Sequence, residues 1–218
     1  MNQYELPDWL WDYTKETIEQ FDFDSSHDLK HFINVYNYTK RIVETDYPQG
    51  TLIKGITRHN SLEILYYAAF SHDLIDSKYV ESKTAIEKLR NLYLSNGYYE
   101  KYLDIIIFLI DNMSYSKQRR GQIIPEKYQL IMNIISDADK LDAYRVERVI
   151  AYHENKNKQT LSERTNKGWI KTILVKRVLT YRDQWLKTNY AKKISLKLHE
   201  QVQLYVDNNL SNIEMYDY

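Results

Sequence analysis

The chain has 218 residues, 43% of them hydrophobic, and its 30 basic and 30 acidic side chains balance, which is typical of a soluble globular protein and gives no overall attraction for nucleic acid. It contains no cysteine, which excludes disulfides, thiolate nucleophiles and cysteine-ligated zinc and leaves histidine and oxygen ligands for any metal. Its five glycines and three prolines are far below average usage of about 7% and 5%, which favours long helices, and the glycine spacing excludes Walker and Rossmann phosphate loops.

Apolar side chains recur at the spacing of an amphipathic helix through the first half of the chain. The pattern predicts helices that begin after Pro7-Asp8, run from Ser25-Ser26 to Tyr47-Pro48, and occupy 61–74, 82–94 and 99–112. Ser25 and Ser26 are good amino-terminal caps for the second helix. The third is apolar on all sides, which predicts that it is buried.

The second half continues the same pattern. Pro125 begins a sixth helix that runs through Ile135, and the spacing leaves open whether it continues or restarts across 137–152. Two further helices are predicted at 167–187 and 191–208. Because no segment alternates as a strand and no low-complexity linker divides the chain, we predict an all-α, single-domain helical bundle over 1–218.

Neither a leader nor a membrane span is indicated. The amino terminus is acidic and lacks an apolar stretch, and the longest purely apolar run, 105–110, is far shorter than the ~20 residues of a membrane helix. We therefore expect a cytoplasmic protein without a membrane partner.

Four side chains able to bind metal occur in or beside these apolar helices. They are His31, the adjacent pair His72-Asp73, and Asp139. Such groups are costly to bury unless they are paired or bound to metal. Two imidazoles and two carboxylates suit one divalent ion, namely Mn, Mg, Co, Fe, Ni or Zn, and leave positions open for water and substrate.

Three ordered segments carry a family resemblance. Residues 24–35 (D-S-S-H-D-L-K-H-F-I-N-V), 68–79 (A-A-F-S-H-D-L-I-D-S-K-Y) and 137–143 (D-A-D-K-L-D-A) resemble motifs of the HD superfamily of metal-dependent phosphohydrolases, most specifically its small stand-alone members. The resemblance covers about 20–155. It implies a helical HD domain on which the helices of 165–210 pack.

The resemblance also implies roles for particular residues. The metal ligands would be His31, His72, Asp73 and Asp139. Two alternatives lie close by in the sequence: Asp137 precedes Asp139, and His27 lies one helical turn before His31 and competes for the first ligand position. The family pattern favours His31 and leaves His27 as a supporting residue or substrate contact.

Further positions match family sites near the substrate. Asp76 is expected to be the general acid or base, and Lys78 and Lys140 to lie near phosphate. Arg145, about one turn beyond Lys140, could join them, and Asp142 could brace a ligand. Charge alone makes the loop pair Arg119-Arg120 a weaker candidate. Asn34 departs from the family pattern, which commonly has Arg at this position. If that Arg supports the site electrostatically, the departure bears on substrate preference more than on metal binding.

These inferences predict a hydrolase that cleaves a phosphomonoester or pyrophosphate bond in a small phosphorylated metabolite, most plausibly a nucleotide. Two alternatives stay open. One is an HD-type oxygenase with two irons, for which His27 and His59 would supply extra ligands. The other is an HD scaffold that binds a nucleotide or a partner without turnover.

Overall fold

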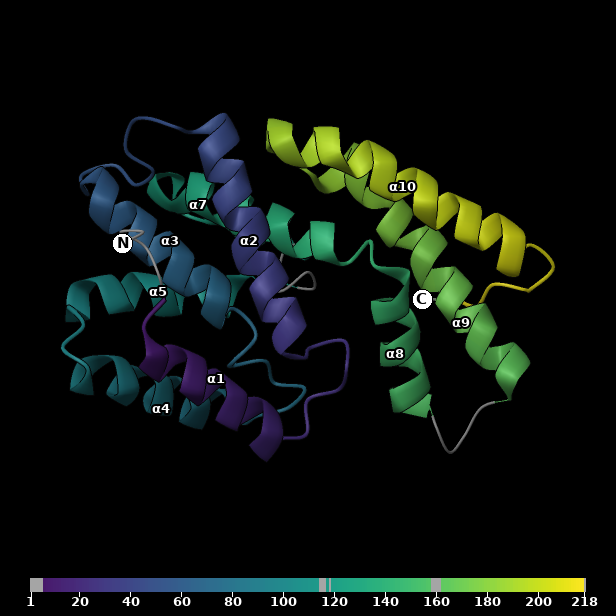
Figure 1. Ribbon diagram of the computed structural model, residues 1–218, viewed down its shortest axis with the longest axis horizontal. Coiled ribbons are helices and arrows are strands. Elements are labelled where there is room, and N and C mark those ends of the chain that lie inside the picture. Colours follow the sequence, from purple (N-terminus) through teal and green to yellow (C-terminus); the bar gives the residue numbers. More distant parts are fainter. Residues whose placement is uncertain (1–5, 114–116, 118, 158–161, 218) are drawn as a thin grey trace.

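The computed structural model describes residues 6–113, 117, 119–157 and 162–217. In chain order the helices are α1 (Asp8–Gln20), α2 (Leu29–Asp46), α3 (Arg58–Ser71), α4 (Ser82–Ser95), α5 (Glu100–Asn112), α7 (Glu126–Asp142), α8 (Val146–Asn157), α9 (Glu163–Lys176) and α10 (Asn189–Asn209). No strand occurs among these residues, so the all-α prediction is confirmed (Figure 1). Within the same ranges, none of the helices has the length and apolar character needed to cross a membrane.

The amino-terminal helices surround α2 and α3. α2 packs against α3 and α7, and α3 packs against α5. The core between them contains Phe32, Leu65, Phe70, Leu103 and Ile134, whose side chains are completely buried. Most side chains of α3 from Ser61 to Ser71 are buried, so the predicted burial of this helix is confirmed. These helices form the left part of the molecule in Figure 1.

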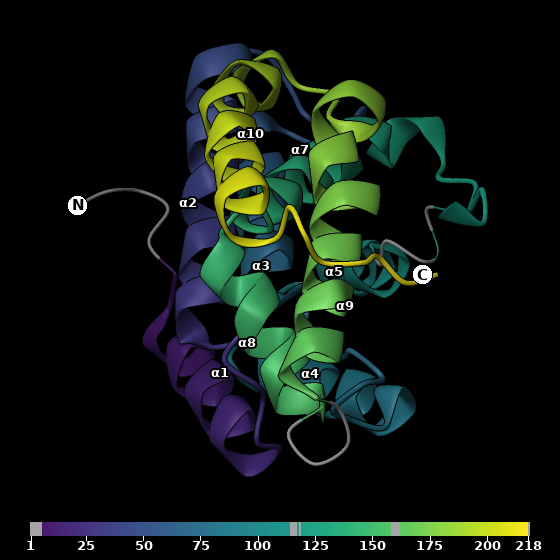
Figure 2. The ribbon, with the colours of Figure 1, turned by 90° about the vertical axis from the view of Figure 1, so that its right-hand side faces the viewer.

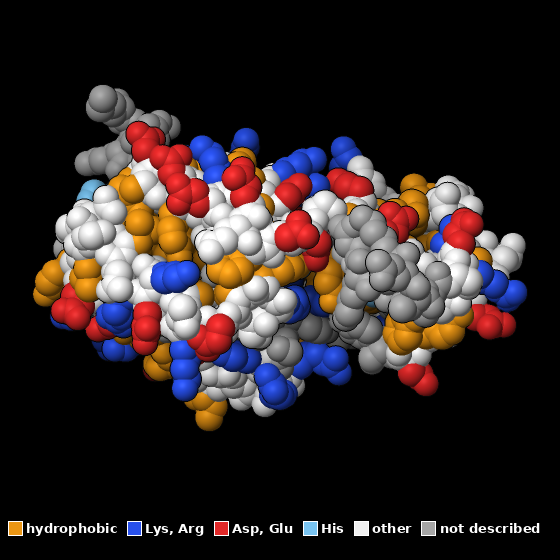
Figure 3. All heavy atoms as spheres, turned by 90° about the horizontal axis from the view of Figure 1, so that it is seen from below, with side chains coloured by type: hydrophobic (Ala, Val, Ile, Leu, Met, Phe, Trp, Pro, Cys, Tyr) orange, Lys and Arg blue, Asp and Glu red, His pale blue; other side chains and the backbone are white. Residues whose placement is uncertain are grey.

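The carboxy-terminal helices enclose a second apolar cluster, built around Tyr144, Leu174, Val178, Tyr181 and Val202. Figure 2 shows α8, α9 and α10 in front of the amino-terminal helices. α10 packs against both α2 and α7, so the two groups of helices belong to one domain. On the face seen in Figure 3, basic and acidic side chains are interspersed, as the balanced charge leads one to expect.

The start of α2 differs from the prediction. The helix begins at Leu29, and its amino-terminal cap is Asp28, whose Oδ1 accepts a hydrogen bond from the His31 N–H at 3.0 Å. Ser25 and Ser26 precede the helix and are not its caps. A carboxylate beside the positive end of the helix dipole stabilises this start.

The carboxy-terminal half contains two further differences. α7 runs to Asp142, and α8 then begins anew, which settles the open question about 137–152. The single helix predicted for 167–187 is wrong, because α9 ends at Lys176 and a 3₁₀ turn (Val178–Thr180) and a π-helical turn (Tyr181–Trp185) follow. Where the winding changes, the backbone N–H of Arg182 donates a hydrogen bond to the Tyr144 hydroxyl at 3.0 Å.

Candidate metal centre

His31 projects from the first turn of α2 toward α7 and is completely buried. Its Nδ1 lies 2.7 Å from Oδ2 of Asp142, a buried residue at the end of α7. A carboxylate can only accept a hydrogen bond, so Nδ1 carries the proton. The Nε2 atom therefore presents an unshared electron pair on the opposite side of the ring.

His72 and Asp73 follow the end of α3. The His72 Nδ1 lies 2.9 Å from the carbonyl oxygen of Ala69, which also only accepts, so this ring is protonated at Nδ1 too. Its Nε2 lies 3.0 Å from Nε2 of His31. The Asp73 Oδ2 lies 3.2 Å from both of these nitrogens.

Three electron-pair donors thus converge on one point: two imidazole nitrogens and a carboxylate oxygen. Because each Nδ1 proton is engaged on the outer side of its ring, the two Nε2 atoms and the carboxylate oxygen face one another around a single point. Such a group is stable only with a shared proton or a cation at its centre. Outward Nδ1–H bonds to a carboxylate and a carbonyl are also the usual supports of metal-binding histidines.

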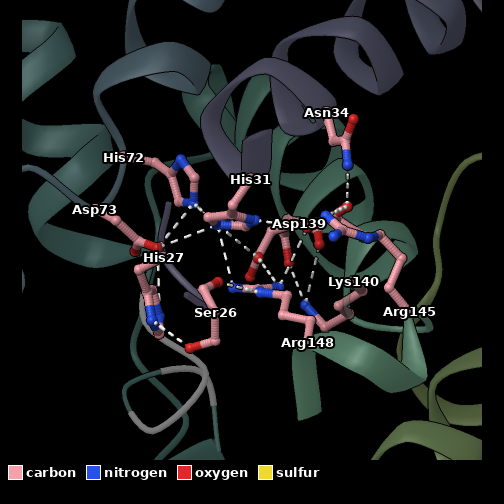
Figure 4. Close-up of polar contacts among 12 residues, drawn as sticks. Ser26, His27, His31, Asn34, His72, Asp73, Asp139, Lys140, Arg145 and Arg148 are labelled. Atoms are coloured by element: carbon pink, nitrogen blue, oxygen red, sulfur yellow. Dashed lines mark hydrogen bonds and ion pairs between the residues drawn. The ribbon is translucent and has the colours of Figure 1, made fainter. Parts of the chain in front are cut away.

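Asp139 completes the cluster from α7. Its Oδ1 lies 3.7 Å from Nε2 of His31, and one ligand atom each from His31, His72 and Asp139 lie within 4.8 Å of one another. In Figure 4, Asp73 and Asp139 flank the imidazole pair. The structure thus brings together the four predicted ligands.

Asp137, the alternative to Asp139, is engaged elsewhere. Its buried carboxylate accepts hydrogen bonds from the backbone N–H groups of Lys187 and Thr188, at 2.9 and 2.7 Å, and from the Thr188 hydroxyl at 2.8 Å. Thr188 in turn caps α10. Asp137 therefore anchors the start of the last helix to α7.

The electrostatics of the cluster favour ionised carboxylates. Burial opposes ionisation of Asp73, but the adjacent imidazoles, His72 foremost, outweigh it and hold the pKa well below its ordinary value. Burial likewise opposes ionisation of Asp139, and the Arg148 guanidinium and the histidines outweigh it, so its pKa is also lowered. Both side chains are therefore ready to bind a cation at neutral pH.

A second group of residues braces His31 from behind. Burial raises the pKa of Asp142, but the hydrogen bond from His31 and nearby cations outweigh it and lower the pKa to about 2. The Oδ1 of Asp142 accepts a hydrogen bond from Asn34 Nδ2 at 2.7 Å and lies 3.2 Å from Arg145 Nη1 (Figure 4). Asn34 therefore supports the carboxylate that orients His31.

The cluster opens into a cavity of about 640 Å³ between the two groups of helices. Its lining includes His27, Asp76 and Lys78. Lys78 pairs with Asp76 at 3.2 Å, and its side chain is 53% exposed. The basic residues of the lining are Lys78, Lys117, Arg119, Arg120, Arg148 and Arg177, and the acidic ones are Asp73, Asp76, Asp111 and Asp139. A chain with no net charge thus has more cations than carboxylates around its cavity.

Two of the expected phosphate contacts lie away from the lining. Lys140 is buried, its Nζ contacts Ser136, and it lies 5.8 Å from the ring centroid of Trp185. Burial lowers its pKa to about 8. Arg145 bonds to Asp142 and, at 3.0 Å, to Glu147. The weaker candidates Arg119 and Arg120 lie at the cavity and are exposed.

Arg148, on α8, was missed by the sequence analysis. Its guanidinium lies 3.2 Å from Nε2 of His31 and 3.5 Å from Oδ1 of Asp139, and its Nε donates to the Ser26 carbonyl at 2.6 Å. No motif distinguishes it from Arg145 in the sequence. The break between α7 and α8 decides which of the two arginines faces the metal ligands.

His59, proposed above as an extra ligand for a second iron, lies near the amino-terminal end of α3. His72 follows the opposite end of this helix, so the two residues are ~20 Å apart along its axis at 1.5 Å per residue. His27, by contrast, lines the cavity, and its Nε2 is 3.7 Å from Oδ2 of Asp73. Only His27 of this pair is thus placed near the cluster.

Comparison with known proteins shows the fold. No protein-family model matches the sequence, and no curated protein does either. A crystal structure of Bacillus subtilis YpgQ in complex with ADP is similar, with a TM-score of 0.65 and 18% identity over 94% of both chains. Selenomethionine YpgQ gives a TM-score of 0.67 at 18% identity, covering 95% of this chain and 97% of that one.

A protein from Lactobacillus plantarum is also similar, with a TM-score of 0.62 and 19% identity over 93% of this chain and 96% of that chain. Coverage of nearly the whole length of each chain means that the carboxy-terminal helices are included in the likeness. At this level of identity, the likeness shows a common all-helical fold.

Proposed function

We propose that the protein is a metal-dependent phosphohydrolase of the HD superfamily that acts on a nucleotide. The observation that carries this proposal is the convergence of the Nε2 atoms of His31 and His72, 3.0 Å apart, with Oδ2 of Asp73 at 3.2 Å from each. Their proton arrangement supports a cation site, and the order of the three sequence motifs supports the family.

The ligands fit a hard or borderline divalent ion. Two imidazole nitrogens come from His31 and His72, and carboxylate oxygens come from Asp73 and Asp139, which is a donor set common to Mn, Fe, Co, Ni and Zn sites. When bound, such an ion supplies positive charge for phosphoryl oxygens and makes water more acidic. Asp142 supports this role because it holds the His31 ring in place.

The protein's own cations would hold the phosphate. Arg148 contacts the ligand cluster, is 11% exposed and lines the cavity, so a phosphoryl group beside the ligands lies within its reach. A guanidinium can bind two phosphate oxygens at once. Lys78 also lines the cavity and pairs with Asp76, which is our candidate for transferring a proton to the leaving oxygen.

The cavity has an apolar side as well. Val149, Ile173, Val178 and Tyr181 line the wall formed by α8, α9 and the following turns. A volume of about 640 Å³ lies within the usual range for small-molecule sites and greatly exceeds the needs of inorganic phosphate. A nucleotide, charged at one end and aromatic at the other, suits such a cavity, and the ADP complex of the similarly folded YpgQ supports the same class.

The proposal is tested with a panel of nucleoside mono-, di- and triphosphates and inorganic pyrophosphate. Each is incubated with the metal-free protein to which Mn²⁺, Mg²⁺, Co²⁺, Ni²⁺, Zn²⁺ or Fe²⁺ is added. We expect hydrolysis with at least one ion, and release of phosphate or of pyrophosphate identifies the bond that is cleaved. An Asp73→Ala sample purified in parallel excludes a contaminating phosphatase. Failure of every combination, or equal activity in that variant, would contradict the proposal.

A further inference from the structure

A polar network outside the ligand cluster surrounds His27. Asp24 and Ser26 precede α2, and Tyr79 follows the His72-Asp73 segment. The Tyr79 hydroxyl lies 2.5 Å from Asp24 Oδ2 and 2.7 Å from His27 Nδ1. The Ser26 hydroxyl contacts Asp24 Oδ1. It also lies 2.7 Å from the same His27 nitrogen (Figure 4). Two hydroxyls thus connect one carboxylate to one ring nitrogen.

The available protons determine the direction of each hydrogen bond. Burial opposes ionisation of Asp24, but hydrogen bonds from His27, Ser26 and Tyr79 outweigh it, and its pKa lies well below the ordinary value. The ionised carboxylate only accepts, so both hydroxyl protons point toward Asp24. Each hydroxyl oxygen then turns an electron pair toward His27 Nδ1. That nitrogen must carry the ring proton.

The neutral imidazole has a single ring proton, so Nε2 of His27 faces the cavity as an acceptor. The 3.7 Å between this Nε2 and Asp73 Oδ2 agrees with that state, because two acceptors cannot form a hydrogen bond. Phe23 stacks on Tyr79 with ring centroids 4.2 Å apart and holds the phenol in place. Ser26 and His27 are buried, so bulk water does not compete for these contacts.

We propose that Asp24, Ser26 and Tyr79 are positioning residues that fix His27 as the Nδ1–H tautomer, so that its Nε2 accepts a hydrogen bond from the water that attacks the phosphoryl group. This role rests on the proposed hydrolytic function. It gives His27 a task different from that of a metal ligand, and it gives Tyr79, which does not line the cavity, an effect on the reaction through His27.

Nitrogen NMR of ¹⁵N-labelled protein tests the tautomer directly, because the two ring nitrogens have distinct shifts when protonated or bare. His27→Gln identifies the His27 signals by their loss, and spectra are recorded without metal and with diamagnetic Zn²⁺. We expect the Nδ1–H form in the wild type. Asp24→Asn supplies an NH₂ group that donates to Tyr79, which turns the phenol proton toward His27 and shifts the ring toward the Nε2–H form. A wild-type ring in the Nε2–H form would overturn the proposal.

Kinetics test the role in the reaction. In Tyr79→Phe we expect kcat to fall by about 10–100-fold, as for a misplaced reacting group, with KM and Mn²⁺ affinity unchanged. In a His27→Gln background, the same Tyr79→Phe change should add no further loss. Tyr98→Phe, at a half-buried tyrosine that does not line the cavity, serves as the control and keeps wild-type kcat.

These outcomes distinguish the positioning role of Tyr79 from the proposed hydrolytic function. A loss in Tyr79→Phe that persists undiminished in the His27→Gln background shows a merely structural role and overturns the positioning proposal. If the wild type hydrolyses no nucleotide with any ion, the proposed function and the water contact both fall, whereas the tautomer is still decided by the nitrogen shifts. Should Asp24→Asn fail to fold, Tyr79→Phe removes one of the two hydroxyl oxygens that accept the Nδ1 proton and should raise the fraction of the Nε2–H form above that of the wild type.

Discussion

The two groups of helices contribute to the cavity in different ways. The amino-terminal helices, α1 to α7, supply the whole ligand cluster from α2, α7 and the segment after α3. The carboxy-terminal helices supply the facing wall, with Arg148 and Tyr152 from α8 and Arg177 and Tyr181 from α9 and the turns after it. The first group provides the means to hold a cation, and the second determines what fits opposite it.

This difference explains why the ligand cluster could be predicted from the sequence and the facing wall could not. A histidine or aspartate within an apolar helix is conspicuous because its burial needs a partner. An arginine or tyrosine on a helix with one polar face is ordinary, and its direction depends on where the helix begins. The lesson is that the chemistry of such a site is easier to predict than its substrate.

The largest effect should follow from Asp73→Ala. Removing the carboxylate shared by His31 and His72 should reduce hydrolysis to background and abolish the stabilisation of the fold by Mn²⁺, because ligand binding raises the melting temperature only while the site is intact. Circular dichroism should show unchanged helical content. Asp104→Ala, which removes an exposed carboxylate paired with Arg90, is the matched control and keeps both properties.

Activity that survives in Asp73→Ala would contradict the first half of the comparison, because it would mean that the amino-terminal helices do not supply the reactive centre. A variant that loses activity but still gains stability from Mn²⁺ would show that His31, His72 and Asp139 bind the ion without Asp73.

Arg148→Ala should have the next largest effect. If the α8 guanidinium holds phosphoryl oxygens, kcat should fall by about 10²–10³-fold, the usual loss for one group that stabilises developing charge. Arg148→Lys should recover only part of it, because an ammonium cannot bind two oxygens in the same plane. Arg145→Ala is the matched comparison, and equal losses in the two alanine variants would contradict the assignment. Steady-state kinetics over a range of Mn²⁺ concentrations separates this effect from metal affinity.

The sequence predicted the helical class, the approximate positions of most helices and the four candidate ligands that cluster. It did so because apolar periodicity and buried polar groups are local signals. It failed at 167–187, where the Tyr144 hydroxyl accepts the Arg182 N–H and stabilises a change of winding. That contact joins residues 38 positions apart, and nothing in the local pattern indicates it.

The roles of the basic residues were the least predictable part of the site. Arg145 and Arg148 are three positions apart and both contact Asp142, at 3.2 and 3.7 Å, yet of the two only Arg148 also reaches Asp139 and lines the cavity. A continuous helix through this segment would have placed both on neighbouring positions of one face. The restart of the chain as α8 separates them, and its position depends on packing between the two groups of helices.

A smaller effect is expected from Tyr181→Phe, which tests whether the facing wall selects the substrate. The Tyr181 hydroxyl accepts a hydrogen bond from Arg177 Nε at 2.6 Å. Its loss removes one support of Arg177, a cation of the lining, and should raise the KM for a nucleotide by about tenfold at most, since one hydrogen bond contributes about 1 kcal/mol, with little change in kcat. Inorganic pyrophosphate, too small to span the cavity, should show no change. A fall in kcat for both compounds would show that Tyr181 takes part in the reaction itself. It would contradict the assignment of substrate selection to the carboxy-terminal helices and of the reaction to the amino-terminal ones.

The smallest effect concerns the carboxy-terminal tail, which holds α9 in place. The Tyr216 N–H donates to the Thr172 hydroxyl at 2.7 Å, and the Tyr216 ring stacks on Trp169 with centroids 5.2 Å apart. A Cβ added at Gly168 would lie 2.1 Å from Tyr216 Cε2. Gly168→Ala should therefore lower the free energy of unfolding by about 1–3 kcal/mol. The melting temperature should fall by about 2–4 °C for each kcal/mol lost.

A double-mutant cycle separates the contact with the tail from the helix propensity of residue 168. Alanine is favoured over glycine within a helix by about 1 kcal/mol, so a loss of stability in Gly168→Ala can come only from a collision. In a Tyr216→Ala background the collision with the ring is absent, but the Glu214 carbonyl oxygen, 2.8 Å from the added Cβ, remains, so the penalty should shrink. Because α9 carries Ile173 of the apolar wall, nucleotide KM should rise in Gly168→Ala while Mn²⁺ affinity stays unchanged. An equal penalty in both backgrounds would show that the Tyr216 ring does not position this wall.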